Sequence, residues 1–204
     1  MSPAHYDILV EEPSMEAFLD SLLPRILGET VTFSLFQHQC KDRLLKDLPK
    51  RFAGYANYLS AGTKVIVLVD RDDDDCVELK RSIEEMAERS GLRVRSRSGR
   101  DDWQVSVRIA VEELEAWYFG EWQAITEAYH RVSPSVPSKA AFRESDAITG
   151  GTWEAFERVL KQYGYFKNGL RKIEAARAIG SRIDIDRSRS RSFQAFVDLL
   201  REAG

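Results

Sequence analysis

Residues 64–75 read KVIVLVDRDDDD, and this stretch decides the fold. Its apolar part, Val65–Val69, is uninterrupted and rich in β-branched residues, which favour strands. A run of this length without polar alternation is typical of a strand buried on both faces, as in a parallel sheet covered by helices. We therefore predict a strand over Lys64–Val69, followed directly by an acidic loop that starts at Asp70.

The segments around this strand alternate between strand and helix patterns. Tyr6–Val10 is a short β-rich run, and the helix after it is expected to have Ser14 as its N-cap and Gly28 as its stop. Strands that alternate with crossover helices indicate an α/β fold, here a Rossmann-type, largely parallel sheet flanked by helices. The further expected strands are Val31–Phe36, Leu92–Arg97 and Gln104–Val111, and the further expected helices are Arg43–Leu48, Phe52–Leu59, Cys76–Ser90 and Glu112–Phe119.

The character of the sequence changes after residue 130. Residues 133–139, SPSVPSK, are rich in Pro and Ser and indicate a linker or a long loop. The chain beyond them lacks strand patterns and contains three amphipathic segments. We predict an α/β core over residues 1–130 and a helical C-terminal part over residues 138–204 that packs on it, with helices at Trp153–Tyr163, Leu170–Ile179 and Phe193–Leu200.

The composition excludes several classes of protein. The 204 residues include 30 Lys and Arg against 33 Asp and Glu, for a net charge of −3, and 43% are hydrophobic, which excludes a disordered or collagen-like chain. Cys40 and Cys76 lack the CxxC spacing of zinc or redox sites and are expected to be free thiols. No signal peptide pattern and no apolar run of ~18 residues is present. We expect a cytoplasmic protein without a membrane partner; the oligomeric state stays open, with a homodimer as one alternative.

Carboxylates follow three of the predicted strands, at the point where each strand ends. Because the carboxyl ends of parallel strands meet at one edge of a sheet, these side chains are expected to form one cluster. Clustered carboxylates repel one another and either take up protons or recruit a cation. A set of oxygen donors suits Mg²⁺ or Mn²⁺ and does not suit zinc. The residues concerned are Glu11, Glu12, Asp70, Asp72, Glu112, Glu113 and Glu115.

Local spacing refines this cluster. If residues 70–72 are extended, Asp70 and Asp72 point the same way and can share one metal ion. If a helix starts at Glu112, then Glu112 and Glu115 lie on one face and reach the metal site while Glu113 points to solvent. One of residues 73–75 is expected to cap the next helix. Asp74 in this loop and Glu16 in the first turn of the first helix are further candidates for the site, although Glu16 equally suits the helix dipole.

The order of these motifs resembles the Toprim domain of topoisomerases, bacterial primases and OLD-family nucleases. LVEEPSMEAFLDSLL, VIVLVDRDDDDC and RIAVEELEAWYFG are most similar to a bacterial family of Toprim-like proteins of unknown function, often encoded beside an ATPase. By this resemblance Glu11 matches the Toprim glutamate, and Asp70 and Asp72 match its metal-binding pair. Many Toprim domains carry Gly after the glutamate; this chain has Glu12, whose side chain narrows the approach of a phosphate.

Basic residues form a second candidate feature, a binding patch for nucleic acid. Six arginines lie within twenty residues, enough to follow a phosphate backbone, although solvated surface positions would explain them equally well. Lys172 is a separate candidate to stabilise charge that develops on a phosphate. The six arginines are Arg89, Arg93, Arg95, Arg97, Arg100 and Arg108, of which Arg93, Arg95, Arg97 and Arg100 are the expected nucleic-acid contacts.

These observations predict a divalent-metal-dependent nuclease that cuts DNA or RNA with Glu11, Asp70 and Asp72 as its catalytic residues. One or two metal ions would activate a water and stabilise the leaving group. Glu11 is a metal ligand or, as the resemblance also implies, a general acid or base. The resemblance implies a phage-defence effector that acts with a partner ATPase. Two alternatives remain: a nucleotidyl transferase, and a regulatory subunit that binds metal or nucleic acid and is inactive without the ATPase.

Overall fold

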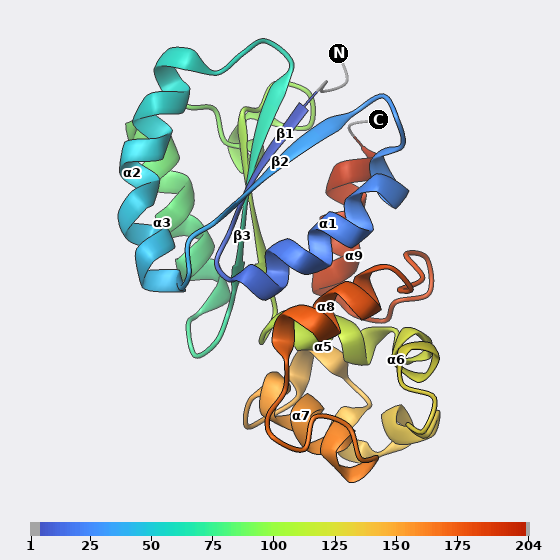
Figure 1. Cartoon of the computed structure of the whole chain (residues 1–204). Helices are drawn as coiled ribbons and strands as arrows, with labels where there is room; N and C mark the ends of the chain where they lie inside the picture. The colour runs from blue at the N-terminus through green and yellow to red at the C-terminus, as the bar shows by residue number, and fades with distance from the viewer. Residues whose placement is uncertain (1–4, 203–204) are drawn as a thin grey trace.

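A computed structural model describes residues 5–202 and organises them around one four-stranded sheet with the strand order β2-β1-β3-β4 (Figure 1). Every neighbouring pair in this sheet is parallel. The register places Ile8 of β1 between Leu35 of β2 and Ile66 of β3. The α/β fold with a parallel sheet is therefore confirmed. The strands are β1 (His5–Val10), β2 (Thr32–Gln37), β3 (Thr63–Asp70) and β4 (Val105–Ala110).

Helices cover both faces of the sheet, and the central strand β3 contributes to a core on each side. Val65, Val67 and Val69 pack with α2 and α3, whereas Ile66 and Leu68 pack with α1 and α9. This two-sided burial is what the continuous apolar run of β3 predicts. The helices around the sheet are α1 (Pro13–Leu27), α2 (Lys41–Tyr58), α3 (Cys76–Arg89), α4 (Arg95–Ser98) and α9 (Arg191–Arg201).

The remaining helices form a part that lies beyond one end of the sheet (Figure 1). Its hydrophobic core is continuous with that beneath α1: the Phe18 ring lies 5.8 Å from Trp117 and 6.5 Å from Phe193. Helix α8 packs closely on α1 at Gly180, where an added Cβ would lie 2.6 Å from the carbonyl oxygen of Phe18. These elements are α5 (Leu114–Gly120), α6 (Trp122–Ala128), η1 (Val136–Ser138), η2 (Ala140–Phe142), η3 (Ser145–Ala147), α7 (Thr152–Gln162) and α8 (Lys172–Gly180).

Three local predictions need correction. The strand expected over Leu92–Arg97 is wrong: only Val94 forms an isolated bridge, because the chain turns into α4 as soon as its buried apolar residues end. Ser14 is not the N-cap of α1, since Pro13 fits the first helical position and moves the cap to Glu12. The two helical pieces expected around Pro49 are one helix, α2.

Two expected helix ends are confirmed. Gly28 ends α1 as its C-cap, with a φ of 66° that glycine adopts without strain. Asp75 caps α3, and its carboxylate accepts hydrogen bonds from the backbone N–H groups of Val77 and Glu78, both at 2.9 Å. Within residues 5–202 no helix is long and apolar enough to cross a membrane.

Candidate functional site

Three buried carboxylates lie together at the carboxyl-terminal ends of the sheet strands, which we call the carboxyl edge of the sheet. Glu11 follows β1, Asp70 ends β3, and Glu115 lies in the first turn of α5, shortly after β4. Their exposed fractions are 7%, 7% and 3%, unusually low for acidic side chains. Because β1, β3 and β4 are parallel neighbours, their ends bring together residues that are 59 and 45 positions apart in the sequence.

Asp70 lies at the centre of this group. Its backbone N–H donates to Glu11 Oε2 at 3.3 Å, which fixes the Glu11 carboxylate beside the end of β3. Its own Oδ1 is buried and has no hydrogen-bond partner among the described residues. Burial raises the pKa of Asp70 well above its usual range, and the negative charges of Glu11 and then Glu115 raise it further. A buried oxygen in this condition needs either a proton or a cation.

The two glutamates are perturbed in the same direction. Burial raises the pKa of Glu11 to about 7, and nearby Asp72 adds to the effect while Lys41 opposes it. Burial also raises the pKa of Glu115 to about 7, with Lys172 acting in the opposite direction. Both groups therefore exchange protons near neutral pH, the range that general acid–base chemistry requires.

Asp72 reaches the site by a different route from the one predicted. The extended geometry expected for residues 70–72 is wrong, because Asp72 has a φ of 50° in the left-handed region. Its Oδ2 instead lies 2.7 Å from Lys41 Nζ, which also contacts Asp74 Oδ2 and the Arg71 carbonyl oxygen, each at 2.9 Å. Asp72 is nevertheless close enough to Glu11 to raise its pKa.

Lys41 is a site residue that the sequence reasoning missed. It is the first residue of α2 and lies just beyond β2, at the same edge of the sheet as the carboxylates. Its side chain is only 13% exposed, and its contacts with Asp72 and Asp74 raise its pKa, although burial acts against this. Its position after a predicted strand, at the edge where the acids were sought, is the signal that could have identified it.

The acidic segment after β4 divides into three different environments. Glu112 precedes α5 with a φ of 65° and pairs with Arg71, so the shared helix face predicted for Glu112 and Glu115 is wrong. Glu113 does not point to solvent: its Oε2 accepts from Thr152 N and Oγ1, each at 2.8 Å, and from Trp153 N at 3.0 Å. The Glu113 carboxylate thus caps α7 and holds it against α5.

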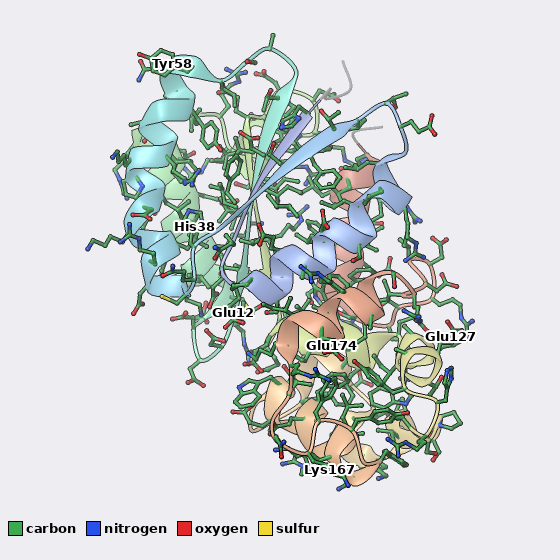
Figure 2. The ribbon with its side chains drawn as sticks, in the orientation of Figure 1. Glu12, His38, Tyr58, Glu127, Lys167 and Glu174 are labelled. Carbon is green, nitrogen blue, oxygen red and sulfur yellow. The ribbon has the colours of Figure 1, made fainter. Side chains whose placement is uncertain are left out.

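Helix α8 brings a second lysine to the site. Lys172, at the start of α8, has its Nζ 3.5 Å from Glu12 Oε2 and 5.1 Å from the centre of the Trp153 ring. Figure 2 shows Glu12 at the start of α1, where Ser14 Oγ also donates to its carboxylate at 3.0 Å. The charges of Glu115, Glu12 and Glu113 outweigh the effect of burial and raise the pKa of Lys172. Lys172, a candidate phosphate contact in the sequence analysis, therefore lies beside the acids.

Two further polar groups lie near this edge. His38 follows β2 (Figure 2), and its Nδ1 lies 3.2 Å from the Val10 carbonyl oxygen while its buried Nε2 has no partner among residues 5–202. The buried hydroxyl of Tyr118 is also unpartnered in this part of the chain. Burial, then the charges of Glu115 and Asp70, raise the pKa of Tyr118 far above its usual range. Neither residue was singled out from the sequence.

The remaining candidates lie outside the carboxylate group. Glu16 lines a surface pocket formed by α1, β2 and α8, together with Asp20 and Arg177. Asp74 contacts Lys41, as described above.

The predicted arginine patch lies at the opposite edge of the sheet. Five of its six residues precede β4 and Arg108 lies within it, whereas the carboxylates follow the strands. Each of the four arginines expected to bind nucleic acid pairs with a carboxylate of the chain. The pairs are Arg93 with Asp102 at 3.0 Å, Arg97 with Glu88 at 2.9 Å, Arg100 with Glu202 at 3.4 Å, and Arg95 with Glu202.

The oxygen donors at the carboxyl-terminal ends of the strands suit a hard divalent cation. Their present arrangement does not yet form a complete coordination site. Carboxylate oxygens are the preferred ligands of Mg²⁺ and Mn²⁺, and Asp70 Oδ1 is a buried acceptor without a donor. In the described part of the chain, however, no three Asp, Glu, His or Cys side chains are grouped so as to hold a metal ion. If a metal ion took the place of the Lys41 ammonium beside Asp72, the Asp72 carboxylate would become a further oxygen ligand.

Comparison with known proteins identifies a family. No curated protein and no solved structure matches the chain. A family model described as a domain of unknown function, DUF4276, matches residues 10–201. This range includes the described carboxylates, both lysines and all helices from α1 to α9. The chain therefore belongs to the DUF4276 family of domains of unknown function.

Proposed function

We propose that the protein is a divalent-metal-dependent nuclease that hydrolyses phosphodiester bonds of DNA or RNA. The observation that carries the proposal is the joint burial of Glu11, Asp70 and Glu115 with Asp70 Oδ1 left unpartnered. Buried carboxylates that form no ion pair destabilise a fold, so a functional role explains them better than a structural one. Mg²⁺ or Mn²⁺ is the ion that such an oxygen donor set favours.

The resemblance to Toprim domains supports the same proposal. Glu11 lies between β1 and α1, and Asp70 ends a buried hydrophobic strand, which is the order of elements on which the resemblance rests. The proposal also takes from it the biological context, a bacterial defence effector that acts with a partner ATPase. Glu12 stands where many Toprim domains have glycine. It pairs with Lys172, which offsets part of the negative charge that an incoming phosphate would meet there.

The carboxylates have distinct roles in this proposal. Glu11, Asp70 and Asp72 would hold the ion, and Glu115 would be a further oxygen donor. Mg²⁺ or Mn²⁺, when bound, makes a water more acidic and offsets negative charge on a phosphate. Glu11, whose pKa is about 7, is able to accept or release a proton at neutral pH.

The two lysines are the proposed phosphate contacts. Lys41 and Lys172 are the cations that lower the pKa values of Glu11 and Glu115, respectively, and so lie close to the carboxylates. Each now pairs with a carboxylate, Asp72 or Glu12, that a phosphate oxygen of the substrate would replace as the acceptor. The Trp153 ring beside Lys172 offers a flat surface for a base.

One observation favours a second candidate function, an effector subunit that is inactive until its ATPase partner binds. The Lys41–Asp72 contact keeps one predicted ligand occupied, and no set of three donors is grouped among residues 5–202. A partner that moved the loop after β3 would release Asp72. In this form the same residues act, but the isolated chain binds substrate without cutting it.

The test is cleavage of plasmid, single-stranded DNA and tRNA with Mn²⁺ or Mg²⁺. The wild type is compared with the Asp70→Ala/Asp72→Ala double variant and with Asp101→Ala/Asp102→Ala, which removes the same charge at the opposite edge of the sheet. Cutting by the wild type and the control, but not by the site variant, is the expected result. Wild-type protein that binds the metal without cutting points to the partner-dependent form, and a protein that neither binds nor cuts refutes the proposal.

A further inference from the structure

We propose that two copies of the chain associate through β2, which pairs antiparallel with β2 of the second copy and joins the two sheets into one. This inference concerns a strand that contributes none of the three buried carboxylates, and it does not depend on the nuclease proposal. It rests on the unpaired backbone groups of β2, on the lack of charge in this strand, and on the pocket beside it.

Strand β2 is an edge strand with one neighbour, β1, in the sheet formed by residues 5–202. Directly after β2, His38 N donates to Val10 O at 3.1 Å, so the backbone of His38 faces β1. Because bonded residues alternate along a parallel ladder, the N–H and C=O groups of Phe33, Leu35 and Gln37 face away from β1. No backbone or side-chain group of the described residues bonds to these outward groups. In Figure 1, β2 lies in front of the other strands, and no helix of the described chain crosses in front of it.

Strand β2 lacks the features that usually keep an edge strand from pairing. Charged side chains, Pro, bulges or a covering segment normally have this role. The other edge strand, β4, has such protection, because Val105 N donates to Arg93 O at 3.1 Å and Arg108 lies within the strand. In contrast, residues 30–40 contain no Lys, Arg, Asp, Glu or Pro, and the register of β2 with β1 is continuous. An edge strand of this kind is expected to be covered in the native protein.

The outward residues of β2 suit pairing with a second β2. They are spaced two apart, with Leu35 in the middle. With a two-fold axis beside Leu35, this residue faces Leu35 of the second copy, and Phe33 faces Gln37. Opposed residues of this kind exchange both N–H···O bonds in an antiparallel ladder, so all the outward groups of both copies find partners. The same surface is used twice, as two-fold symmetry requires.

A pocket of about 390 Å³ beside β2 offers side-chain contacts to the second copy. It lies on the face of the sheet that α1 covers and is lined by Phe33 and Leu35, together with residues of α1 and α8. Its lining includes Ile173, which is 43% exposed and one of the few large apolar side chains exposed on the described surface. Because Leu35 lies beside the proposed axis, the pockets of the two copies adjoin there, and their apolar side chains lose contact with water.

The charges of this pocket are complementary to those of a second copy. Two acids, Glu16 and Asp20, and one cation, Arg177, line it. None of the three forms an ion pair with another side chain of residues 5–202. Two-fold symmetry brings the acids of each copy toward the cation of the other, which favours self-association.

These features favour a second copy over other occupants of β2. A nucleic acid would need cations along the strand, which residues 30–40 do not supply. A strand of a different protein would satisfy the backbone groups, but the central place of Leu35 and the mixed charges of the pocket match a second copy without further assumptions. Both alternatives are outcomes of the experiment.

The first measurement is sedimentation of the wild type over a range of concentrations, where we expect a species of twice 23.3 kDa that dissociates on dilution. Leu35→Glu and Leu35→Lys each place like charges opposite one another and are expected to weaken self-association at least about tenfold. An equimolar mixture of the two variants is expected to restore the dimer, because opposite charges then meet. Tyr58→Glu, at an 87% exposed position at the end of α2, is the control and leaves the dimer unchanged.

The second measurement uses the wild type alone and decides the question if the Leu35 variants do not fold. Hydrogen exchange is followed residue by residue at high and low protein concentration. The amides of Phe33, Leu35 and Gln37 are expected to exchange at least tenfold more slowly at high concentration. Those of Ser34 and Phe36, which face β1, are expected to stay protected at both concentrations.

Four results would overturn the proposal. The first is a wild type that stays monomeric at every concentration, which would leave β2 to a different protein. The second is a dimer in which the outward amides exchange as fast as in the monomer. The third is a pair of folded Leu35 variants that still dimerise separately, or whose mixture stays monomeric. The fourth is a single-stranded oligonucleotide that dissociates the dimer and protects the outward amides, which would assign β2 to nucleic acid.

Discussion

Replacement of Glu115 by glutamine tests whether an ionised, buried carboxylate at this site lowers the stability of the fold. Glu115 is 3% exposed, and burial is the main cause that raises its pKa to about 7, with Lys172 opposing the shift. The folded protein therefore binds a proton at Glu115 more tightly than the unfolded chain does. Consequently the contribution of Glu115 to stability is lost as pH rises from its ordinary pKa toward 7.

The expected magnitude follows from the two pKa values. The difference between the ordinary 4.5 and about 7 corresponds to roughly 3 kcal/mol once the carboxylate is fully ionised. Glutamine is neutral at every pH and nearly the same size. Glu115→Gln is therefore expected to raise the free energy of unfolding by about 2–3 kcal/mol at pH 8, and by less than about 1 kcal/mol at pH 5. For a chain of this length, the pH 8 effect corresponds to a Tm higher by about 5–10 °C.

The assay is thermal and urea unfolding at pH 5 and pH 8, in EDTA so that no divalent cation contributes. Glu84→Gln is the matched control, because Glu84 is also buried, at 7% exposed, but accepts a hydrogen bond from Ser96 and lies near Lys80. We expect the control to show no comparable gain at pH 8. With Mn²⁺ present, the wild type gains stability and Glu115→Gln gains less.

The reasoning would be refuted if Glu115→Gln lowered the stability at pH 8, or changed it equally at both pH values. Either result would mean that Lys172 holds Glu115 as an ionised, stabilising partner. The pair would then have a structural role, and the argument from uncompensated burial would apply only to Glu11 and Asp70.

Three further predictions concern other parts of the molecule. Stabilisation of the fold by Mn²⁺ should grow between pH 6 and 8, because the ion must displace protons from Glu11 and Asp70. It should reach about 2.7 kcal/mol at a free Mn²⁺ concentration of 100 times Kd. Equal Mn²⁺-induced Tm shifts in the wild type and in Asp70→Asn would argue against the site. Glu113→Ala should cost about 1–2 kcal/mol through loss of the α7 cap, whereas Glu154→Ala on the same helix serves as the control in urea unfolding. Gly180→Ala should lower the free energy of unfolding by about 1–3 kcal/mol, because the new Cβ would lie 2.6 Å from Phe18 O. Gly54→Ala, with open space around the new Cβ, should be neutral or stabilising by up to ~1 kcal/mol. Equal Tm values for the two variants would contradict the close α1–α8 packing.

Much of the fold could be predicted from the sequence because it depends on local patterns. The continuous apolar run Val65–Val69 identifies a strand buried on both faces. The alternation of strands with helices then predicts a parallel sheet, because each helix connects two strands that run in the same direction. Parallel strands place all their carboxyl ends at one edge, so Glu11 and Asp70 could be brought together by topology alone. A cap among residues 73–75 could likewise be predicted, because a capping residue acts on its own helix, and the structure shows that this residue is Asp75.

Other features were decided by tertiary structure, because they depend on partners distant in the sequence. The contacts of Lys41 with Asp72 and of Glu113 with α7 join segments 31 and 39 residues apart, and no local pattern specifies them. The left-handed backbone at Asp72 and Glu112, which redirects both side chains, lies in the loops after β3 and β4.

The arginines show the same distinction on the scale of the whole sheet. The sequence by itself determined that Arg93 and Arg97 are close together and charged, and that acids follow the strands. Only the folded chain showed that residues 92–97 do not form a strand and that Arg93 and Arg97 pair with carboxylates. The physical reason is that an ion pair between two elements depends on how those elements pack in space, whereas residue type and spacing along the chain specify contacts only within one element.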